Sequence, residues 1–403
     1  MKCRFCGHEA KHELIDLINA PASNAYLSHE QLNEPENFYP LKVLVCDKCF
    51  LVQVDEYHKS DELFSANYAY FSSMSSSWVE HARKYVEMIT EKQKLSSSSQ
   101  VIEIASNDGY LLQFFKLKNI PCIGIEPTKS TADVARSKGI EVIEDFFGEK
   151  LACGLPKADL ILGNNVLAHV PDINDFVKGL KLALKPDGII TMEFPHVLNL
   201  ISQNQFDTIY HEHFSYLSLY TTTKVFEANG LTIFDTDEIP THGGSIRIYA
   251  THKDDNRKKS DSYYSVLKKE SAAHLDSLDG YGSFQIKANK IKYDFLEFLL
   301  KAKKENKKVA GYGAAAKGNT LLNYCGIKND LIDFVVDKAP LKIGNYLPGS
   351  HIPIVTEEII REIHPDFVVI FPWNIKEEVM TQLSYIRGWN GKFVTAIPFL
   401  DIV

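Results

Sequence analysis

Short apolar runs typical of β-strands recur along the middle of the chain and alternate with segments that have helical periodicity. The runs lie at residues 101–105, 122–126, 141–145, 159–164, 188–194, 231–239 and 245–250. Strands that alternate with helices are typical of a doubly wound α/β sheet. We therefore predict one such sheet between residues 101 and about 250.

A second alternation of strands and helices follows a long helical region. Residues 262–308 predict one long helix or a helical pair, interrupted at residues 280–282. The pattern then predicts a strand at 309–311, a loop at 313–320, a helix at 321–325 and strands at 332–337, 367–371 and 393–397. This order indicates a second, smaller α/β domain.

Length, composition and charge narrow the class of protein. A chain of 403 residues is too long for one compact core, so two or three domains are expected. The net charge of -8 argues against a nucleic-acid-binding protein. No apolar run reaches the length of a membrane span, and the first residues lack the apolar core of a signal peptide. We expect a cytoplasmic protein with reduced thiols and no membrane partner.

Four of the seven cysteines form two pairs with the same spacing. Cys3 and Cys6 make one CxxC motif, and Cys46 and Cys49 make the other. Four thiolates suit a tetrahedral zinc ion that is closed to substrate, and such an ion stabilises a short domain with little core. The alternative is a redox-active CxxC, which two such pairs in an intracellular chain disfavour. We predict a structural Zn²⁺ site.

The first strand of the central sheet is followed by a turn of small residues. Glu103 lies on the strand, and Ala105, Asn107, Asp108 and Gly109 make the turn. A short turn of this type lets the chain approach a nucleoside closely. It lacks the GxGxxG pattern, so it is a poor match to a dinucleotide site.

The next three strands also end in residues suited to a nucleoside. These residues are Glu126 and Pro127, then Asp145 and Phe146, then Asn164 and Asn165. The first carboxylate can accept both ribose hydroxyls, and the second pair suits an adenine amine and its ring face. The alternative is a Rossmann-like fold for another cofactor, but the order of these strand ends favours S-adenosylmethionine.

Residues 210–214 bring two imidazoles, a carboxylate and a phenol together in the sequence Tyr-His-Glu-His-Phe. Imidazole titrates near neutral pH, so such a cluster can hold and tune a proton acceptor. A methyl-transfer enzyme needs such an acceptor when its nucleophile is a carbon that must first lose a proton. For any single histidine, a satisfied surface or core role remains the alternative.

A turn rich in small residues opens the second α/β domain. Its candidate ligands are Gly313, Ala314, Ala315, Lys317 and Asn319. Backbone N–H groups there can reach a pyrophosphate, because a helix N-terminus favours negative charge. Asp337 ends the next strand, where it could meet a ribose. His242 and Arg247 are candidate cleft residues, although a tight turn explains the two glycines between them equally well.

Five motifs together resemble one family across nearly the whole chain. They are the paired CxxC knuckles, EIASNDG, NNVLAHV, YHEHFSY and GYGAAAKGN. The combination resembles the S-adenosylmethionine-dependent sugar C-methyltransferases that act on nucleotide-linked 4-keto-deoxysugars, typically at C-3. The resemblance implies an α/β chain with a zinc-binding domain (1–67), a Rossmann-like class I methyltransferase domain (68–253), a helical connection (254–308) and a Rossmann-like sugar-nucleotide domain (309–403).

The same resemblance implies catalytic roles. His213 would remove the C-3 hydrogen, Glu212 and Tyr210 would orient it or contact the sugar, and His169 would line the same cleft. The family also places a functional tyrosine in the region of Tyr68 and Tyr70.

Either of these two phenols could hydrogen-bond the C-4 oxygen as negative charge develops, and packing against the zinc domain is the alternative. The expected partner is a sugar nucleotide, with dTDP ahead of GDP or CDP, and the expected state is a monomer.

Two other functions fit part of the pattern. An epimerase or dehydratase on the same ketosugar would use the enolate without a methyl donor, but Glu126, Asp145 and Phe146 favour methyl transfer. A zinc-domain scaffold that only binds a nucleotide would not need the histidine cluster.

Overall fold

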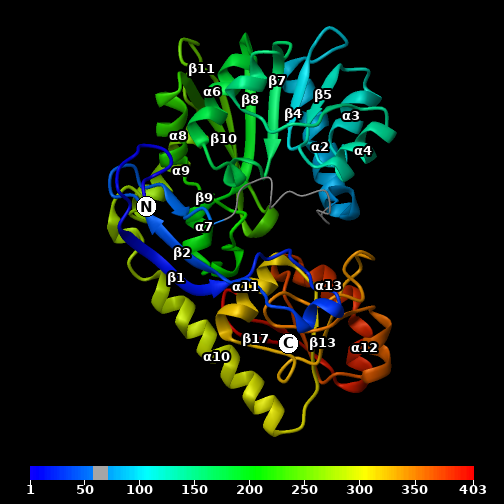
Figure 1. Cartoon of the computed structure of the whole chain (residues 1–403). Helices are drawn as coiled ribbons and strands as arrows, with labels where there is room; N and C mark the ends of the chain where they lie inside the picture. The colour runs from blue at the N-terminus through cyan, green and yellow to red at the C-terminus, as the bar shows by residue number, and fades with distance from the viewer. Residues whose placement is uncertain (58–70) are drawn as a thin grey trace.

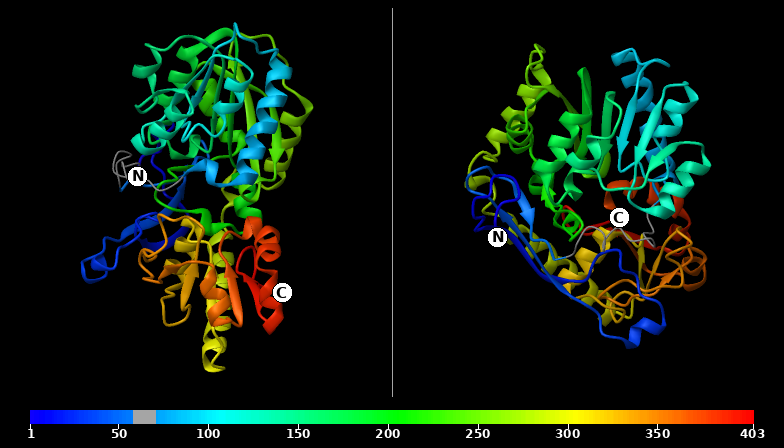
Figure 2. Two further views of the ribbon diagram at one scale, coloured as in Figure 1. Left: turned by 90° about the vertical axis from the view of Figure 1, so that its right-hand side faces the viewer. Right: turned by 45° about the horizontal axis from the view of Figure 1, so that its top comes forward.

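Three β-sheets organise residues 1–57 and 71–403, which are the residues that the computed structural model describes. A small sheet forms near the N-terminus, and two larger sheets lie at opposite ends of the molecule (Figure 1). A long helix runs along one side, next to the first strands (Figure 2). Within these described ranges, no helix is both long enough and apolar enough to cross a membrane.

The N-terminal sheet is antiparallel and has four strands. In spatial order they are β1 (His12–Ala20), β2 (Tyr39–Val45), β3 (Val52–Val54) and β9 (Ser215–Tyr216), with the 3-10 helix η1 (Glu30–Asn33) between β1 and β2. Leu41, Val43 and Val45 are buried and their neighbours are more exposed, as the two-residue period of a half-buried strand requires. Because β9 comes from far along the chain, the zinc-domain sheet is completed by the segment that carries the histidine cluster.

The central sheet has five parallel strands and an antiparallel hairpin at one edge. In spatial order it consists of β10 (Leu231–Ile239), β11 (Ser245–His252), β8 (Leu184–Pro195), β7 (Ala158–Asn164), β4 (Val101–Ile104), β5 (Cys122–Ile125) and β6 (Glu141–Ile143). All seven predicted strands are present. The chain order reverses between β4 and β7, and such a reversal opens a crevice at the carboxyl ends of the strands.

Helices surround this sheet. They are α2 (Ser76–Gln93), α3 (Leu112–Leu117), α4 (Lys129–Ser137), α5 (Glu149–Ala152), α6 (Ile173–Ala183), α7 (Val197–Ser202), α8 (Leu219–Ala228) and α9 (Asp261–Ala272), with 3-10 turns η2 (Ser72–Met74), η3 (Leu167–His169), η4 (Phe206–Thr208) and η5 (Thr241–Gly243). The hydroxyl of Ser75 caps α2 by accepting the Trp78 N–H. Ala82, Val86 and Ile89 are buried at helical spacing, so one face of α2 packs on the core.

The predicted helical pair is confirmed, because α9 and the long helix α10 (Phe284–Lys304) are separated by a break that contains η6 (Leu278–Gly280). The C-terminal sheet has the spatial order β14 (Ile354–Val355), β13 (Phe334–Val336), β12 (Val309–Tyr312), β15 (Phe367–Ile370), β16 (Lys392–Thr395) and β17 (Asp401–Ile402). Its helices are α11 (Ala316–Cys325), α12 (Glu358–Ile363), α13 (Lys376–Gln382), η7 (Trp373–Ile375) and η8 (Ser384–Trp389). The order reverses between β12 and β15, so this sheet also has a crevice at its carboxyl ends.

One prediction for this domain is wrong. Residues 316–320 are helical rather than part of a loop, because α11 begins at Ala316 after the extended residue Ala315. Alanine and lysine are strong helix formers, and local propensity outweighed the small-residue pattern here. Lys317 and Asn319 therefore lie on the first helical turn.

The two larger sheets meet through loops at their carboxyl ends. Helix α11, which follows β12, packs on η4 and on β1. The turn η5, which joins β10 to β11, packs on η7, which follows β15. The connections after the strands of the two larger sheets therefore form a seam between the domains.

Candidate active site

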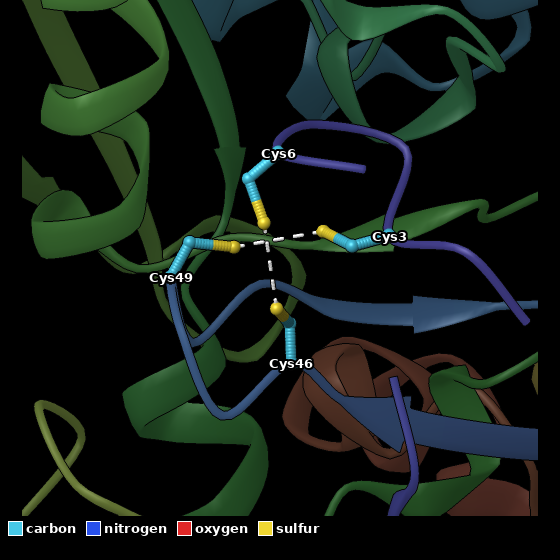
Figure 3. A group of neighbouring side chains, drawn as sticks. All are labelled: Cys3, Cys6, Cys46 and Cys49. Carbon is cyan, nitrogen blue, oxygen red and sulfur yellow. Dashed lines mark hydrogen bonds between the residues drawn. The ribbon is translucent and has the colours of Figure 1, made fainter. Parts of the chain in front are cut away.

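The four predicted cysteine ligands converge on one point, as Figure 3 shows. Their sulfur atoms all lie within 4.8 Å of one another, with Cys3 Sγ 3.5 Å from Cys49 Sγ and Cys6 Sγ 3.6 Å from Cys46 Sγ. A tetrahedral zinc ion with Zn–S bonds of about 2.3 Å needs sulfurs about 3.8 Å apart. The donor set therefore fits zinc, with Cys3 and Cys6 approaching from the N-terminal turn and Cys46 and Cys49 from the turn between β2 and β3.

The turn after β4 is shaped for close approach of a ligand. Ala105, Asn107 and Gly109 all have positive φ angles, an arrangement that is strained for the two residues with side chains. A Cβ at Gly109 would lie 2.4 Å from Ile140 Cδ1, so only glycine fits there.

The carboxylate of Glu103 lies beneath this turn. It is fully buried, and neither of its oxygens has a hydrogen-bond partner among the described residues. Burial raises the pKa of Glu103 well above its ordinary value, and Asp108 and Glu126 raise it further. A buried acceptor without a donor is costly, so this carboxylate fits a site where a bound cationic or N–H group completes it.

Glu126 follows β5 and lies beside the same turn. Its carboxylate accepts the backbone N–H of Asn107 at 2.9 Å and that of Thr128 at 2.9 Å, and burial raises its pKa. Asp108 Oδ2 accepts the Ser73 N–H at 3.3 Å, and its Oδ1 has no partner within the described ranges. Pro127 follows Glu126 in the connection to α4, and Asp145 and Phe146 lie exposed after β6.

The two asparagines after β7 point to different neighbours. Asn164 Nδ2 donates at 3.3 Å to the hydroxyl of Tyr110, which follows Gly109 in the turn after β4. Asn165 has a φ of 55°, and its Nδ2 lies 2.9 Å from His242 Nε2. His242 also has a positive φ of 54°, and burial lowers its pKa to about 4. Two strained residues that hold each other are typical of a functional site.

Arg247 belongs to a buried network of hydrogen bonds and ion pairs inside the central domain. Its guanidinium donates to Glu193 Oε2 at 2.6 Å, and the same carboxylate binds His81 Nε2 at 2.9 Å. The guanidinium also lies over the Tyr85 ring, 4.4 Å from its centroid. Glu193 Oε1 accepts the Thr241 hydroxyl at 3.0 Å, so the network supports the turn that carries His242.

His213 is held as a neutral imidazole with one defined orientation. Its Nδ1 lies 3.1 Å from the Thr208 carbonyl oxygen, which can only accept, so Nδ1 carries the proton and Nε2 keeps its lone pair. The ring centroid lies 4.0 Å from Tyr210 and 4.6 Å from His169. Burial lowers the pKa of His213 well below its ordinary value, and the charges of His169, His242 and Lys317 act in the same direction.

The other members of the cluster have separate partners. His169 Nδ1 donates to the Glu212 carbonyl at 2.7 Å, and burial lowers its pKa to about 4. The Glu212 carboxylate accepts the Ser23 hydroxyl at 2.8 Å and the Asn24 amide at 3.2 Å. Ser23 and Asn24 belong to the zinc domain, in the connection after β1, so that domain reaches the histidine segment directly.

The same connection also binds the C-terminal domain. Asn319 Nδ2 donates to the Ser23 carbonyl at 2.6 Å, and the Tyr26 hydroxyl donates to the Ala314 carbonyl at 2.6 Å. Thr320 Oγ1 donates to the Ile209 carbonyl at 2.8 Å. The connection after β1, the segment before the histidine cluster and the start of α11 are far apart in sequence, and they therefore meet beside the histidine cluster.

The small-residue turn after β12 keeps the geometry of a helix N-terminus. Gly313 has a φ of 86°, and Ala314 N–H donates to Asp337 Oδ2 at 2.7 Å, so Asp337 braces the turn. Ala315 is the extended residue before α11. Lys317 Nζ donates to Asn374 Oδ1 at 2.7 Å and lies 4.6 Å from the centroid of the Trp373 ring.

Trp373 joins this turn to the histidine segment. Its indole N–H donates to Asp207 Oδ2 at 2.7 Å, and Asp207 immediately precedes Thr208, the residue that holds His213. Burial raises the pKa of Asp207 to about 6, while the Lys317 ammonium opposes that rise. The Lys317 turn of the C-terminal domain is therefore linked to the segment that holds His213 in the central domain through Trp373 and Asp207.

Sequence reasoning missed several of these residues. Trp373 and Asn374 follow the strand β15, so the strand-end argument used for the central sheet could have found them. Ser23, Asn24 and Asp207 carry no local signal. Tyr68 and Tyr70 lie outside the described residues.

Three family models match consecutive parts of the chain. Residues 3–64 match a family described as "Putative zinc binding domain", residues 78–236 match "Methyltransferase domain", and residues 240–398 match "C-methyltransferase C-terminal domain". C-methyltransferase NovU from Streptomyces niveus is 32% identical over 401 residues, which is 98% of this chain and 95% of that protein.

Other relatives match shorter parts of the chain. Ubiquinone biosynthesis O-methyltransferase from Actinobacillus pleuropneumoniae is 29% identical over 115 residues, which is 26% of this chain and 49% of that protein. A solved S-adenosylmethionine-dependent methyltransferase from Clostridium acetobutylicum covers 43% of this chain and 92% of its own, with 12% identity and a TM-score of 0.37.

Together, the four-cysteine site, the turn after β4 and the matched domains define an S-adenosylmethionine-dependent C-methyltransferase with an N-terminal zinc-binding domain. The chain belongs to the C-methyltransferase family that includes NovU. The residues around Glu103 fit the methyl donor, since they combine a close backbone turn with a buried acceptor that finds no donor among the residues the structure describes.

Proposed function

We propose that this C-methyltransferase methylates a nucleotide-linked 4-keto-deoxysugar at C-3, and that His213 is the base. The observation that carries the proposal is the neutral His213 imidazole, fixed by Thr208 and placed near the Lys317 charge of the C-terminal domain. A ketone at C-4 acidifies the C-3 hydrogen, so a positioned neutral imidazole suffices to remove it.

The chemistry needs two half-sites that share a seam. His213 Nε2 takes the C-3 proton, and the electron pair of the broken C–H bond is delocalised onto the C-4 oxygen. Bound S-adenosylmethionine supplies an electrophilic methyl group. The C-3 carbon bonds to that methyl as the methyl–sulfur bond breaks. The left-handed turn at Asn107 and the carboxylates of Glu103 and Glu126 support a donor site at β4 and β5.

The sugar nucleotide has a matching site on the other side of the seam. The first turn of α11 presents backbone N–H groups, and Lys317 adds a positive charge for a diphosphate. His242, whose pKa the Lys317 ammonium helps to lower, and Asn165, which holds it, would contact the sugar. We infer dTDP as the carrier ahead of GDP or CDP.

The test compares His213→Asn with His274→Asn, a substitution at an exposed histidine outside the site. With S-adenosylmethionine and a panel of nucleotide 4-ketosugars, methylation by His213→Asn should fall by about 10²–10⁴, the usual value of general-base help. His274→Asn should match wild type, and donor affinity measured by calorimetry should survive in both variants.

Exchange of the C-3 hydrogen in deuterated water, without the donor, separates the alternatives. Wild type should exchange and His213→Asn should not. If His213→Asn keeps methylation while a substitution of His169 or His211 abolishes it, the base is another residue although the reaction stands. Exchange without any methylation on the whole panel would instead indicate an epimerase or dehydratase.

A further inference from the structure

A cavity of about 480 Å³ lies at the carboxyl ends of β15 and β16, against the β10–β11 turn of the central domain. Its walls come from η7 and the start of α13, from residues 395–401, and from Gln203, Pro240, Gly243 and Gly244. Cavities of several hundred Å³ between domains are typical of small-molecule sites. None of the candidate substrate residues predicted from the sequence lines it.

The lining favours a neutral planar group over a phosphate. The rings of Trp373 and Phe399 both line the cavity, and Phe399 is 63% exposed, so its ring is accessible to a ligand. Lys376 Nζ lies 3.6 Å from Asp401 Oδ2, and Glu377 adds a second carboxylate to the lining. The charged groups of the cavity therefore offer no surplus positive charge to a phosphate, whereas the aromatic walls suit a flat ring.

The cavity borders the proposed diphosphate site directly. Asn374, one of its lining residues, accepts the hydrogen bond from Lys317 Nζ at 2.7 Å. The same ammonium lies 4.6 Å from the centroid of the Trp373 ring. A phosphate bound at Lys317 would therefore lie beside Asn374 and Trp373, which line the cavity.

We propose that this cavity is the nucleoside subsite of the enzyme, where the base of the sugar nucleotide lies against Phe399 and Trp373. The proposal rests on the proposed function, since it assigns a place to the nucleoside of that substrate. The diphosphate then lies at Lys317 and the sugar extends toward His213. The base is held over β15 and β16, on the opposite side of the crevice from Asp337.

The test measures the affinity of dTDP and of inorganic pyrophosphate by calorimetry on the full-length protein. The variants are Phe399→Ala, Phe399→Tyr and the control Phe38→Ala, which removes a phenyl ring that is 45% exposed in the zinc domain. Phe399→Ala should weaken dTDP roughly tenfold, within the usual contribution of one base–aromatic stack. Its affinity for pyrophosphate should stay unchanged, and Phe399→Tyr should bind dTDP like wild type.

The outcomes separate this proposal from the proposed function. If wild type binds dTDP, GDP and CDP no better than pyrophosphate, the nucleotide-sugar substrate is wrong and the subsite falls with it. If wild type binds dTDP well but Phe399→Ala matches Phe38→Ala, only the subsite is wrong. An equal loss of dTDP and pyrophosphate in Phe399→Ala would also overturn it, because the side chain would then act on the diphosphate.

Discussion

The contact between Ser23 and Glu212 gives a sharp test of whether the zinc domain takes part in catalysis. Ser23→Ala removes the hydroxyl that donates to Glu212 Oε2 at 2.8 Å. Both residues are buried, with 3% and 4% of their surface exposed, so water cannot easily replace the lost donor. Asn24 still donates to Oε1 at 3.2 Å, so the carboxylate is still held on that side.

The expected loss of kcat follows from these contacts. A hydrogen bond to a charged group contributes about 1.5–3 kcal/mol, and the remaining Asn24 bond favours the lower end. A loss of about 1.4 kcal/mol from the transition state is tenfold in rate. Since the Glu212 carbonyl holds His169 and its segment carries His213, we expect Ser23→Ala to lower kcat about tenfold.

The assay is steady-state methylation with saturating donor, compared with a matched control. Ser28→Ala removes another serine hydroxyl of the same domain that donates to a glutamate, here Glu30 at 2.7 Å, but on the surface. Exposed contacts of this kind contribute little, so the control should keep wild-type kcat. Both variants should retain zinc and donor affinity.

Two results would refute the reasoning. Equal kcat in Ser23→Ala and Ser28→Ala would mean that Glu212 needs no support from the zinc domain. A parallel loss of donor affinity in Ser23→Ala would mean that the substitution disturbs the central domain as a whole rather than the histidine segment.

Three further predictions concern the metal, the donor and pH. Chelation of zinc, or Cys46→Ser, should lower the unfolding temperature of the N-terminal domain and reduce kcat, while the calorimetric affinity for the donor persists. Elemental analysis measures the zinc that is retained. An unchanged melting curve in metal-free protein would contradict the structural role. Glu126→Ala should weaken donor binding severely and leave dTDP binding intact, which calorimetry with each ligand separates. Burial lowers the pKa of His213, and a base must be neutral to accept a proton. We therefore expect kcat/KM to stay level as pH falls from 7.5 through 6 and to decline only at more acidic pH. A decline centred at the ordinary histidine pKa of about 6.5 would show that the base is less buried than the structure indicates.

The sequence by itself determined the features that depend on neighbouring residues. The CxxC spacing predicted the four zinc ligands, because each pair forms one knuckle whose geometry is set within a few residues. The apolar runs predicted the central strands and the helical pair around η6, because the period of buried side chains is a local property. The positions of Glu103, Glu126 and Asn164 at or near the ends of strands predicted that they lie at one edge of the central sheet, because the carboxyl ends of parallel strands share that edge.

Only the tertiary structure decided which distant residues meet. Ser23 and Glu212 are 189 positions apart, and Trp373 and Asp207 are 166 apart, so no local pattern encodes either contact. The start of α11 at Ala316 is the exception, since a local property, the high helix propensity of alanine and lysine, outweighs the small-residue pattern that predicts a loop there. The pairing of Arg247 with Glu193, however, required two strands to be placed side by side. The period of hydrophobic residues and the spacing of metal ligands are properties of the local sequence. The partner of a buried charge, by contrast, depends on the tertiary packing that excludes water from it.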